Sequence, residues 1–370
     1  MRIGIDIRSL IEPFPSGISE YTFQVVKNLL KNNQGNEYIL FYNAKKNLPL
    51  RYENEFKKYS VEIKSTHWPN KLYNLLLFLN IFIKIDKVLG GVDIFFMPNI
   101  NFYSITNRTK LLLTVHDLSY EYPKYFRIKP KFWHKIIKPK KIIQRADKII
   151  AVSENTKQDI INNYKIDKNK ITVIYSGVDT DKFINLADEK KREVRSKYDI
   201  DENYFLYLGN LENRKNIQGI IKSWYWLKKN KNITEQLVMA GKITDKSIIN
   251  QFPEVNFAGY INEDDKPYLY SMAKAFIYPS FYEGFGLPVL EAMAAGCPVI
   301  TSFSTSLPEI ASRAAVYVDP YNINECAEAM YRVLKNEDLR ESLVSQGKKL
   351  IKAFTWDNTI DKMNKIFNEV

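Results

Sequence analysis

The sequence comprises 370 residues, of which 45% are hydrophobic and only two are cysteines. This length and apolar content argue against a disordered protein and are sufficient for the cores of two domains of ordinary size. The cysteines, Cys297 and Cys326, stand in apolar contexts, which argues against a disulfide framework or a cysteine metal site and favours a reducing compartment.

The first residues, MRIGIDIRSL, predict a strand without a preceding apolar signal core or small-residue cleavage site. We therefore expect a cytoplasmic protein. The most apolar stretch, Leu75–Ile83, is interrupted by Asn80 and falls well short of the ~20 residues that a spanning helix needs. The sequence thus predicts a chain that does not cross a membrane.

Charge is distributed unevenly along the chain. Residues 1–180 contain 29 Lys and Arg against 16 Asp and Glu, whereas residues 181–370 contain 25 against 26. The net charge of +12 therefore belongs to the first half, which indicates a polyanionic partner, either an anionic membrane or nucleic acid. The densest part, Lys124–Lys141, has eight Lys or Arg, no acid and interleaved aromatic residues. This mixture is typical of a membrane-interface segment, and a solvated basic helix is an equal alternative.

Strand and helix patterns alternate along the whole chain, which predicts parallel sheets covered by helices, an α/β fold. In the first half the predicted strands are RIGIDI, EYILFYN, VDIFFMP, KLLLTV, KIIAVS and ITVIYS. A helix is predicted from Glu20 to Lys31. Its apolar face consists of Val25, Val26, Leu29 and Leu30. The polar and charge-rich stretch Asp179–Glu202 is interpreted as a linker.

The second half repeats the pattern. Its predicted strands are YFLYLG, QLVMAG, VNFAGY, AFIYPS and CPVITS. The last segment, Trp356–Val370, predicts a helix with Ile360, Met363 and Phe367 on one side. We therefore expect one domain over residues 1–180, a second over 181–355, and a separate C-terminal helix over 356–370.

Two carboxylates, Glu283 and Glu291, flank a predicted helix N-terminus in the sequence AFIYPSFYEGFGLPVLEAMAAG. Gly284 and Gly286 permit a tight turn after the strand, and Pro288 fits a first helical position, so that Glu291 falls in the first turn. Helix N–H groups attract phosphate oxygens, and carboxylates accept hydrogen bonds from sugar hydroxyls, so the pattern suits a sugar nucleotide. If the pair stood in isolation, the alternative to a sugar-nucleotide site would be that Glu291 only complements the helix dipole and that Glu283 is a solvated loop residue.

Other polar residues follow predicted strands, and open parallel sheets bind ligands beyond the carboxyl ends of their strands. His116 follows LLLTV, so it is a candidate site residue. The alternative is that this histidine has only a structural role. Arg214 and Lys215 follow YFLYLG and could clamp a diphosphate, Arg214 through paired hydrogen bonds and Lys215 as a point charge. Gly17 lies between the first strand and the first helix, where backbone amides could meet an anion.

These segments together resemble the retaining family 4 glycosyltransferases, which carry the E-x7-E pattern, over essentially the whole chain. The matching segments occur in family order: SGISEYT, TVHDLS, IIAVSENTKQDI, VIYSGVDTDKF, FLYLGNLENRKNI, the EGFGLP region and SLPEI. The resemblance implies a glycosyltransferase-B fold, with two Rossmann-like domains facing a cleft that holds the active site. It also implies that the helix from Trp356 crosses back onto the first domain.

The resemblance implies a role for ten residues. Four belong to the catalytic group, with Arg214 and Lys215 neutralising the donor diphosphate, Glu283 contacting the donor sugar and His116 lying beside the transferred sugar. Six belong to the donor-binding group: Gly17, whose loop also shapes the acceptor side, Gly284, Phe285, Gly286, Leu287, and Glu291 on the ribose hydroxyls. Many family members have a pair of glycines where this chain has Gly17 alone.

These residues can stabilise a leaving group, because preplaced cations lower the cost of charge that builds on a diphosphate. No metal or other cofactor is required for that, and the tripeptides DTD at 179–181 and DID at 199–201 are discounted because they fall in the predicted linker. The stretches HDLSYEYP and STSLPEI resemble mannosyltransferases of O-antigen or capsule assembly. We therefore predict transfer of a hexose, with mannose from GDP-mannose as the best candidate, to a glycan or lipid-linked acceptor, by an enzyme peripheral to the inner face of the membrane.

Two alternatives belong to other classes of protein. A sugar-nucleotide epimerase of the same fold would use a similar donor site without an acceptor glycan. A nucleic-acid-binding protein would explain the basic first half, but it leaves the E-x7-E segment without a role. We therefore expect no nucleic-acid partner.

Overall fold

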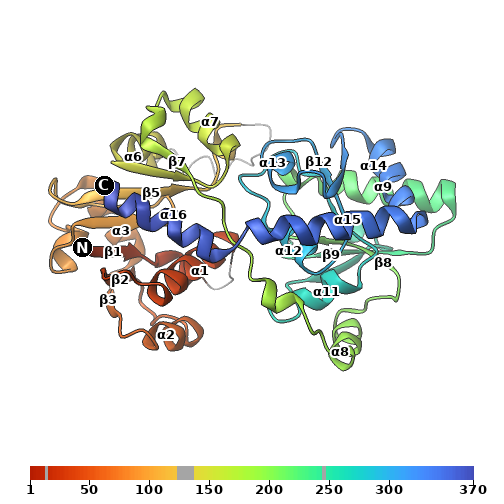
Figure 1. Cartoon of the computed structure of the whole chain (residues 1–370), viewed down its shortest axis with the longest axis horizontal. Helices are drawn as coiled ribbons and strands as arrows, with labels where there is room; N and C mark the ends of the chain where they lie inside the picture. The colour runs from red at the N-terminus through yellow and green to blue at the C-terminus, as the bar shows by residue number, and fades with distance from the viewer. Residues whose placement is uncertain (13–15, 123–136, 244–246) are drawn as a thin grey trace. The chain divides into compact units, whose positions relative to one another are not determined.

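The computed structural model describes residues 1–12, 16–122, 137–243 and 247–370, which form two compact units (Figure 1). The first unit comprises Met1–Glu121, residues 137–177 and the C-terminal segment Trp356–Val370. The second comprises Tyr122 and Val178–Thr355. Within this unit the ring of Tyr122 packs against that of Tyr282, with 5.3 Å between the ring centroids.

The described strands of the first unit form one fully parallel sheet of seven strands, in the order β3-β2-β1-β4-β5-β6-β7. Their bounds are β1 Arg2–Asp6, β2 Glu37–Asn43, β3 Glu62–Thr66, β4 Ile94–Met97, β5 Lys110–Val115, β6 Lys148–Ala151 and β7 Ile171–Val173. The order reverses between β1 and β4, and ligands bind beyond the strand ends at such a reversal.

Helices cover both faces of this sheet, because successive residues of a strand point to opposite sides. Leu40 of β2 packs in the core beneath α1, α2 and α16, whereas Phe41 packs in the core beneath α3, α4, α6 and α7. The helices are α1 Gly17–Lys31, α2 Leu50–Lys57, α3 Asn70–Leu79, α4 Ile85–Val88, α6 Pro139–Arg145, α7 Glu154–Tyr164 and α16 Trp356–Glu369, with 3-10 turns η1 Arg8–Ile11, η2 Ser119–Glu121 and η4 Lys168–Lys170.

The C-terminal helix α16 is part of the first unit's core (Figure 1). Its residues Ile360, Met363 and Phe367 are buried on one side, as the predicted apolar face requires, and the helix lies against α1. The ring of Phe367 meets that of Phe96 on β4 edge to face, with centroids 6.0 Å apart. Thr359 Oγ1 donates a hydrogen bond to the Tyr175 carbonyl oxygen (2.8 Å).

The second unit has the same architecture. Its described strands form a parallel sheet of six in the order β10-β9-β8-β11-β12-β13, which reverses between β8 and β11. The strands are β8 Tyr204–Leu208, β9 Gln236–Ala240, β10 Asn256–Gly259, β11 Ala275–Tyr278, β12 Val299–Ser302 and β13 Ala315–Val318. The helices are η5 Thr180–Phe183, α8 Asp188–Tyr198, η6 Asn213–Lys215, α9 Ile217–Lys231, α10 Ser247–Gln251, α11 Lys266–Met272, α12 Leu287–Ala294, α13 Leu307–Ala311, α14 Ile323–Lys335, α15 Glu337–Leu350 and η7 Ile351–Ala353.

The prediction of parallel sheets covered by helices is confirmed, and each missed strand lies at an edge of its sheet. Strand β3 has the polar sequence EIKST with no fully buried residue, and β13 is a run of four, AVYV. An edge strand needs only one partner and less apolar sequence than a central one, so the polar β3 does not show the pattern that revealed its neighbours. Strand β13 is apolar, but it is shorter than the segments that were predicted as strands.

The structure corrects the predicted linker over Asp179–Glu202. This stretch contains η5 and the three-turn helix α8, and it belongs to the second unit. The linker prediction was wrong because α8 buries only Val194 and so lacks an apolar stripe. An ion pair between Lys197 Nζ and Asp265 (2.6 Å) links this helix to the residue that precedes α11.

None of the helices among the described residues is both long and apolar enough to cross a membrane.

Candidate functional site

Three predicted site residues come together where the second sheet reverses its order. Arg214 and Lys215 lie in η6, shortly after β8, and Glu283 follows β11, the neighbouring strand. The backbone N–H of Phe281 donates to the carbonyl oxygen of Arg214 (2.8 Å), which ties the two loops together. Strands that are distant in sequence thus deliver two cations and a carboxylate to one point.

The carboxylate of Glu283 is buried and shared between the two cations. We call Arg214, Lys215 and Glu283 together the charge cluster. Its Oε1 accepts a hydrogen bond from Lys215 Nζ, and its Oε2 accepts one from Arg214 Nη1 at 3.2 Å. Arg214 also donates from Nε to Glu212 (3.0 Å) and from Nη1 to the Tyr282 carbonyl oxygen (3.2 Å). The Glu283 side chain is only 6% exposed, so its ionised form depends on these partners.

Lys215 is the more buried cation. Its Nζ donates to the Tyr278 hydroxyl (2.5 Å) as well as to Glu283, and it lies 4.9 Å from the centroid of the Tyr278 ring. An ammonium group carries three N–H donors, so one of them has no partner among the described residues. That donor could meet an additional acceptor, such as a phosphate oxygen.

Burial and mutual charge set the protonation of the charge cluster. Burial, reinforced by the charge of Arg214, lowers the pKa of Lys215 to about 8 against the opposing attraction of Glu283. Burial by itself would raise the pKa of Glu283, but the charges of Lys215 and Arg214 outweigh it and hold that pKa below its usual value. Near neutral pH the cluster therefore contains an ionised carboxylate and a lysine close to its titration point.

The loop that carries Glu283 is fixed by two hydroxyl groups that precede α13. Thr305 Oγ1 accepts a hydrogen bond from the Glu283 backbone N–H (2.9 Å), and Ser306 Oγ donates to the carbonyl oxygens of Glu283 (3.1 Å) and Phe285 (2.9 Å). Gly286 has a φ of 106°, a left-handed conformation that favours glycine, and it immediately precedes α12. The buried Gly284 and the half-buried Leu287 complete this turn.

Glu291 lies apart from the charge cluster's contacts. Its carboxylate accepts a hydrogen bond from the Tyr270 hydroxyl of α11 (3.0 Å). The structure corrects its predicted place in the first turn: α12 begins at Leu287, so that Pro288 is the second helical residue and Glu291 the fifth. The one-residue shift of the helix start leaves Glu291 half-buried at the beginning of the second turn.

The two site residues from the first half belong to the first unit. Half-buried His116 follows β5, and its Nε2 lies 2.8 Å from the Pro98 carbonyl oxygen. A carbonyl oxygen only accepts, so Nε2 carries the proton. Burial lowers the pKa of His116, although the Pro98 contact and the charge of Asp117 oppose the shift, so Nδ1 bears a lone pair at neutral pH.

Gly17 is the first residue of α1 and is exposed, and a Cβ atom there would have no neighbour within 4 Å among the described residues. The described part of the chain therefore imposes no steric requirement for glycine at this position. The helix is capped by Ser16, whose Oγ accepts from the Ser19 N–H (3.2 Å). Tyr21, one turn further along α1, packs its ring edge to face on His116, with 4.7 Å between centroids, and so links the two predicted regions.

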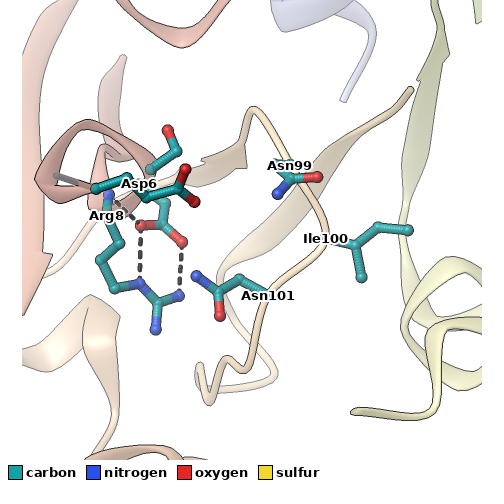
Figure 2. Close-up of a pocket in the computed structure, with 7 residues that line it drawn as sticks. Asp6, Arg8, Asn99, Ile100 and Asn101 are labelled. Carbon is teal, nitrogen blue, oxygen red and sulfur yellow. Dashed lines mark hydrogen bonds and ion pairs between the residues drawn. The ribbon is translucent and has the colours of Figure 1, made fainter. Parts of the chain in front are cut away.

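A pocket of about 140 Å³ lies at the reversal of the first sheet, and the sequence analysis missed it (Figure 2). It is lined by Asp6 at the end of β1, by Arg8, Ser9 and Glu12 just after it, and by Asn99, Ile100 and Asn101 beyond β4. Arg8 pairs with Asp6 through two contacts, at 2.9 and 2.6 Å, and its Nη1 is buried without a partner among the described residues. The signal in the sequence was polar residues directly after RIGIDI and VDIFFMP, the same signal that revealed His116 and Arg214.

Other predicted features fall outside these two places. The basic segment Lys124–Lys141 lies outside the described residues except for its end, 137–141. Within residues 1–12, 16–122, 137–243 and 247–370, no group of three or more His, Cys, Asp or Glu side chains is arranged to hold a metal ion. The D-x-D tripeptides begin at the residue before η5 and at the residue after α8.

Family comparisons agree with this architecture. The model of glycosyltransferase family 4 matches residues 15–182, and that of glycosyl transferases group 1 matches residues 188–350. The two family models together define the chain as a glycosyltransferase. The chain belongs to the glycosyltransferases with these two domains, which confirms the family resemblance seen in the sequence.

Individual relatives are similar over most of the chain. The O-antigen chain mannosyltransferase B of Escherichia coli is 29% identical over 268 residues, which cover 70% of each chain. The serotype-specific mannosyltransferase WbdA of Escherichia coli is 29% identical over 58% of this chain, and the match spans only 28% of that protein. The crystal structure of Anabaena HepE with UDP-glucose superposes with a TM-score of 0.76 over 100% of both chains at 14% identity. That likeness supports the predicted glycosyltransferase-B fold.

We expect the Lys215 ammonium to titrate far below an ordinary lysine, whose pKa is about 10.4. In the full chain with 13C-labelled lysine, the Lys215 signal, assigned by its loss in Lys215→Arg, should have its NMR midpoint at about pH 8. Glu283→Gln should move that midpoint lower, because the carboxylate is the charge that favours the ammonium. A midpoint near 10 in the wild-type protein would contradict the burial of Lys215 in the charge cluster.

Proposed function

We propose that this glycosyltransferase is a retaining, metal-independent mannosyltransferase that moves mannose from GDP-mannose to a glycan or lipid-linked glycan in cell-surface polysaccharide synthesis. The observation that carries the proposal is the charge cluster of Arg214, Lys215 and Glu283 at the reversal of the second sheet. The choice of mannose is supported by two similar proteins that are named as mannosyltransferases.

The charge cluster suits stabilisation of a diphosphate leaving group. When the bond from the anomeric carbon to phosphate breaks, negative charge grows on the diphosphate, and fixed cations lower the energy of that state. The unpaired N–H of Lys215 and the guanidinium of Arg214 would supply these cations, while Glu283 holds both in place. Binding of a dianion would also favour the protonated form of Lys215.

Other donor contacts follow from the placement of α12. Its N-terminal N–H groups would meet the donor after the turn of Gly284–Gly286, and Glu291 would accept hydrogen bonds from the ribose hydroxyls. Tyr270 donates to the Glu291 carboxylate and so orients it for that task. Retention of the anomeric configuration, with the donor phosphate assisting deprotonation of the acceptor, completes the proposed mechanism.

The pocket at the end of β1 and β4 suits the acceptor sugar. Its lining combines carboxylates, carboxamides, a hydroxyl and the buried Arg8, a mixture of donors and acceptors that matches a polyol (Figure 2). The half-buried side chain of Asn99 lines this pocket and makes no hydrogen bond with the described residues. Gly17, which also follows β1, and His116, which follows β5 of the same sheet, would lie on the acceptor side as well.

We further propose that the enzyme works in the cytoplasm as a peripheral protein on the inner face of the membrane. The excess of basic residues in the first half supports this location, because anionic lipids attract such a surface.

The function is tested by nucleotide release with purified protein. GDP should be released from GDP-mannose only when an acceptor glycan is added, whereas an epimerase would convert the sugar nucleotide without acceptor. In a panel of nucleotide sugars, the true donor at 100 times its dissociation constant should stabilise the fold by ~2.7 kcal/mol in a thermal-shift assay.

Arg214→Ala combined with Lys215→Ala should lower turnover on the order of 100-fold or more, because the leaving group loses both cations. The single change Arg214→Ala keeps the Lys215–Glu283 pair and thus tests the same role if the double variant fails to fold. The exposed Lys222 of the same unit is the matched control, as Lys222→Ala. Wild-type turnover in Arg214→Ala and in a folded double variant would refute the proposed role.

Transfer should continue at the wild-type rate in excess EDTA, because protein cations take the place of a metal at the diphosphate. The measurement is initial velocity with and without chelator. Loss of activity that manganese restores would overturn the metal-independent mechanism and would make the D-x-D tripeptides candidate metal ligands again.

Asn99→Ala should raise the KM for the acceptor roughly three- to tenfold, the effect of one lost hydrogen bond, and leave the affinity for GDP unchanged. The exposed Asn107 of the same unit supplies the control variant Asn107→Ala. An unchanged acceptor KM in Asn99→Ala would remove the pocket from the acceptor site, and a weakened affinity for GDP would place it on the donor side instead.

A further inference from the structure

Helix α3 and the residues on either side of it in the sequence expose several large apolar side chains. Of the ten residues of α3, only Tyr73 and Leu77 are buried against the core of the first unit. The exposed members of the group, which we call the α3 surface, are Trp68, Leu72, Leu75, Phe78, Leu79, Ile81 and Phe82. Leu75 is 50% exposed and Phe82 is 93% exposed.

The arrangement of the α3 surface is that of a second apolar face. At 100° per residue, Leu72, Leu75 and Leu79 lie on the side of the helix opposite Tyr73 and Leu77. A helix on a soluble surface normally presents polar residues there. Only three of the ten residues of α3 are polar, namely Asn70, Lys71 and Asn74, and the core of the first unit covers only one of its two apolar faces.

The turn after α3 adds an exposed aromatic side chain. Asn80 ends the helix in a left-handed conformation, and Phe82 also has a positive φ, of 61°. A bulky residue rarely adopts that conformation, and here the strain is combined with exposure of the ring to water. Neither feature is compensated by a contact that the described residues make with the ring of Phe82.

The charges around the α3 surface are positive. Lys71, Lys84 and Lys87 stand beside it in sequence, and Lys138 Nζ lies 5.1 Å from the centroid of the Phe78 ring. The one acid between residues 67 and 92, Asp86, is buried and accepts hydrogen bonds from Thr106 and Thr109. The apolar group is therefore bordered by cations without an exposed acid among them.

We propose that the α3 surface docks on an anionic lipid bilayer, with α3 parallel to the membrane plane and Leu75, Leu79 and Phe82 inserted among the lipids. A ten-residue helix is about 15 Å long, half of the thickness of the hydrocarbon core, so it lies in the interface and does not span it. Cations flanking an apolar face are the pattern of interfacial helices. A second copy of this chain would bring the same positive charges to the contact, whereas anionic headgroups neutralise them.

This inference deepens the proposed function and rests on its peripheral location, because it names the surface that would make the attachment. It does not depend on donor or acceptor chemistry. The inserted apolar side chains lie outside Lys124–Lys141, and Lys138 of that segment is one of the cations beside them. If the chain does act on a lipid-linked glycan, the docked α3 surface would keep the first unit where that acceptor is anchored.

The test is co-sedimentation of the full chain with vesicles of phosphatidylcholine, with and without 30% phosphatidylglycerol. The wild-type protein should bind the anionic vesicles at low salt and bind them more weakly at high salt. The triple variant Leu75→Gln, Leu79→Gln, Phe82→Gln should bind at least tenfold more weakly, because neutral polar groups replace the inserted side chains. Lys71→Gln with Lys84→Gln should lower binding to anionic vesicles and abolish most of its salt dependence.

The matched control replaces exposed apolar residues of the second unit, Ile184→Gln and Ile249→Gln, and should bind vesicles as the wild type does. Nucleotide binding without lipid, measured by thermal shift, reports separately on the donor site and on folding of each variant. Failure of the wild type to sediment with anionic vesicles, or equal binding by a folded triple variant, would overturn the proposal. A lipid-free dimer that the triple variant abolishes would identify the α3 surface as an interface between copies instead.

Discussion

The second unit depends on the pairing of one buried carboxylate. Glu283 is almost completely removed from water, and an unpaired charge there would cost several kcal/mol. Lys215 and Arg214 compensate it, and because they follow β8 while Glu283 follows β11, the pairing joins the two loops at the reversal of the sheet. The same arrangement leaves one ammonium N–H of Lys215 without a partner among the described residues, and this is the donor that the proposed function assigns to the diphosphate.

The two sheets repeat one topology and place polar residues by one rule. In each, the order reverses next to the first strand of the unit, between β1 and β4 and between β8 and β11. Loops on either side of such a reversal diverge and leave room for a ligand. The charge cluster occupies this position in the second unit, and the pocket of Arg8 and Asn99 occupies it in the first. Both candidate binding places thus follow from strand order.

The exposed apolar side chains of α3 differ from the rest of the first unit, where apolar side chains are buried in two cores. Elsewhere in the first unit, strand residues alternate between two well-filled cores, and α16 returns from the C-terminus to complete one of them. Helix α3 contributes Tyr73 and Leu77 to the other core and leaves an equally apolar face uncovered. A folded chain rarely leaves so much apolar surface without a partner. The surface is therefore best understood as a contact with something outside the chain.

Local sequence by itself determined the central strands, the apolar face of α1 and α16, and the family, because strand-length apolar runs and helical periodicity need no knowledge of distant residues. It also identified Arg214, Lys215 and Glu283 individually. It failed at β3 and α8, where sparse burial leaves no strong pattern, and at β13, which is an apolar run of only four residues. Only the tertiary structure decided that the carboxylate of Glu283 is buried between Lys215 and Arg214, that Asp6 and Asn99 share a pocket, and that α3 is left uncovered. Those facts depend on which strands become neighbours, and residues far apart in the chain determine that together.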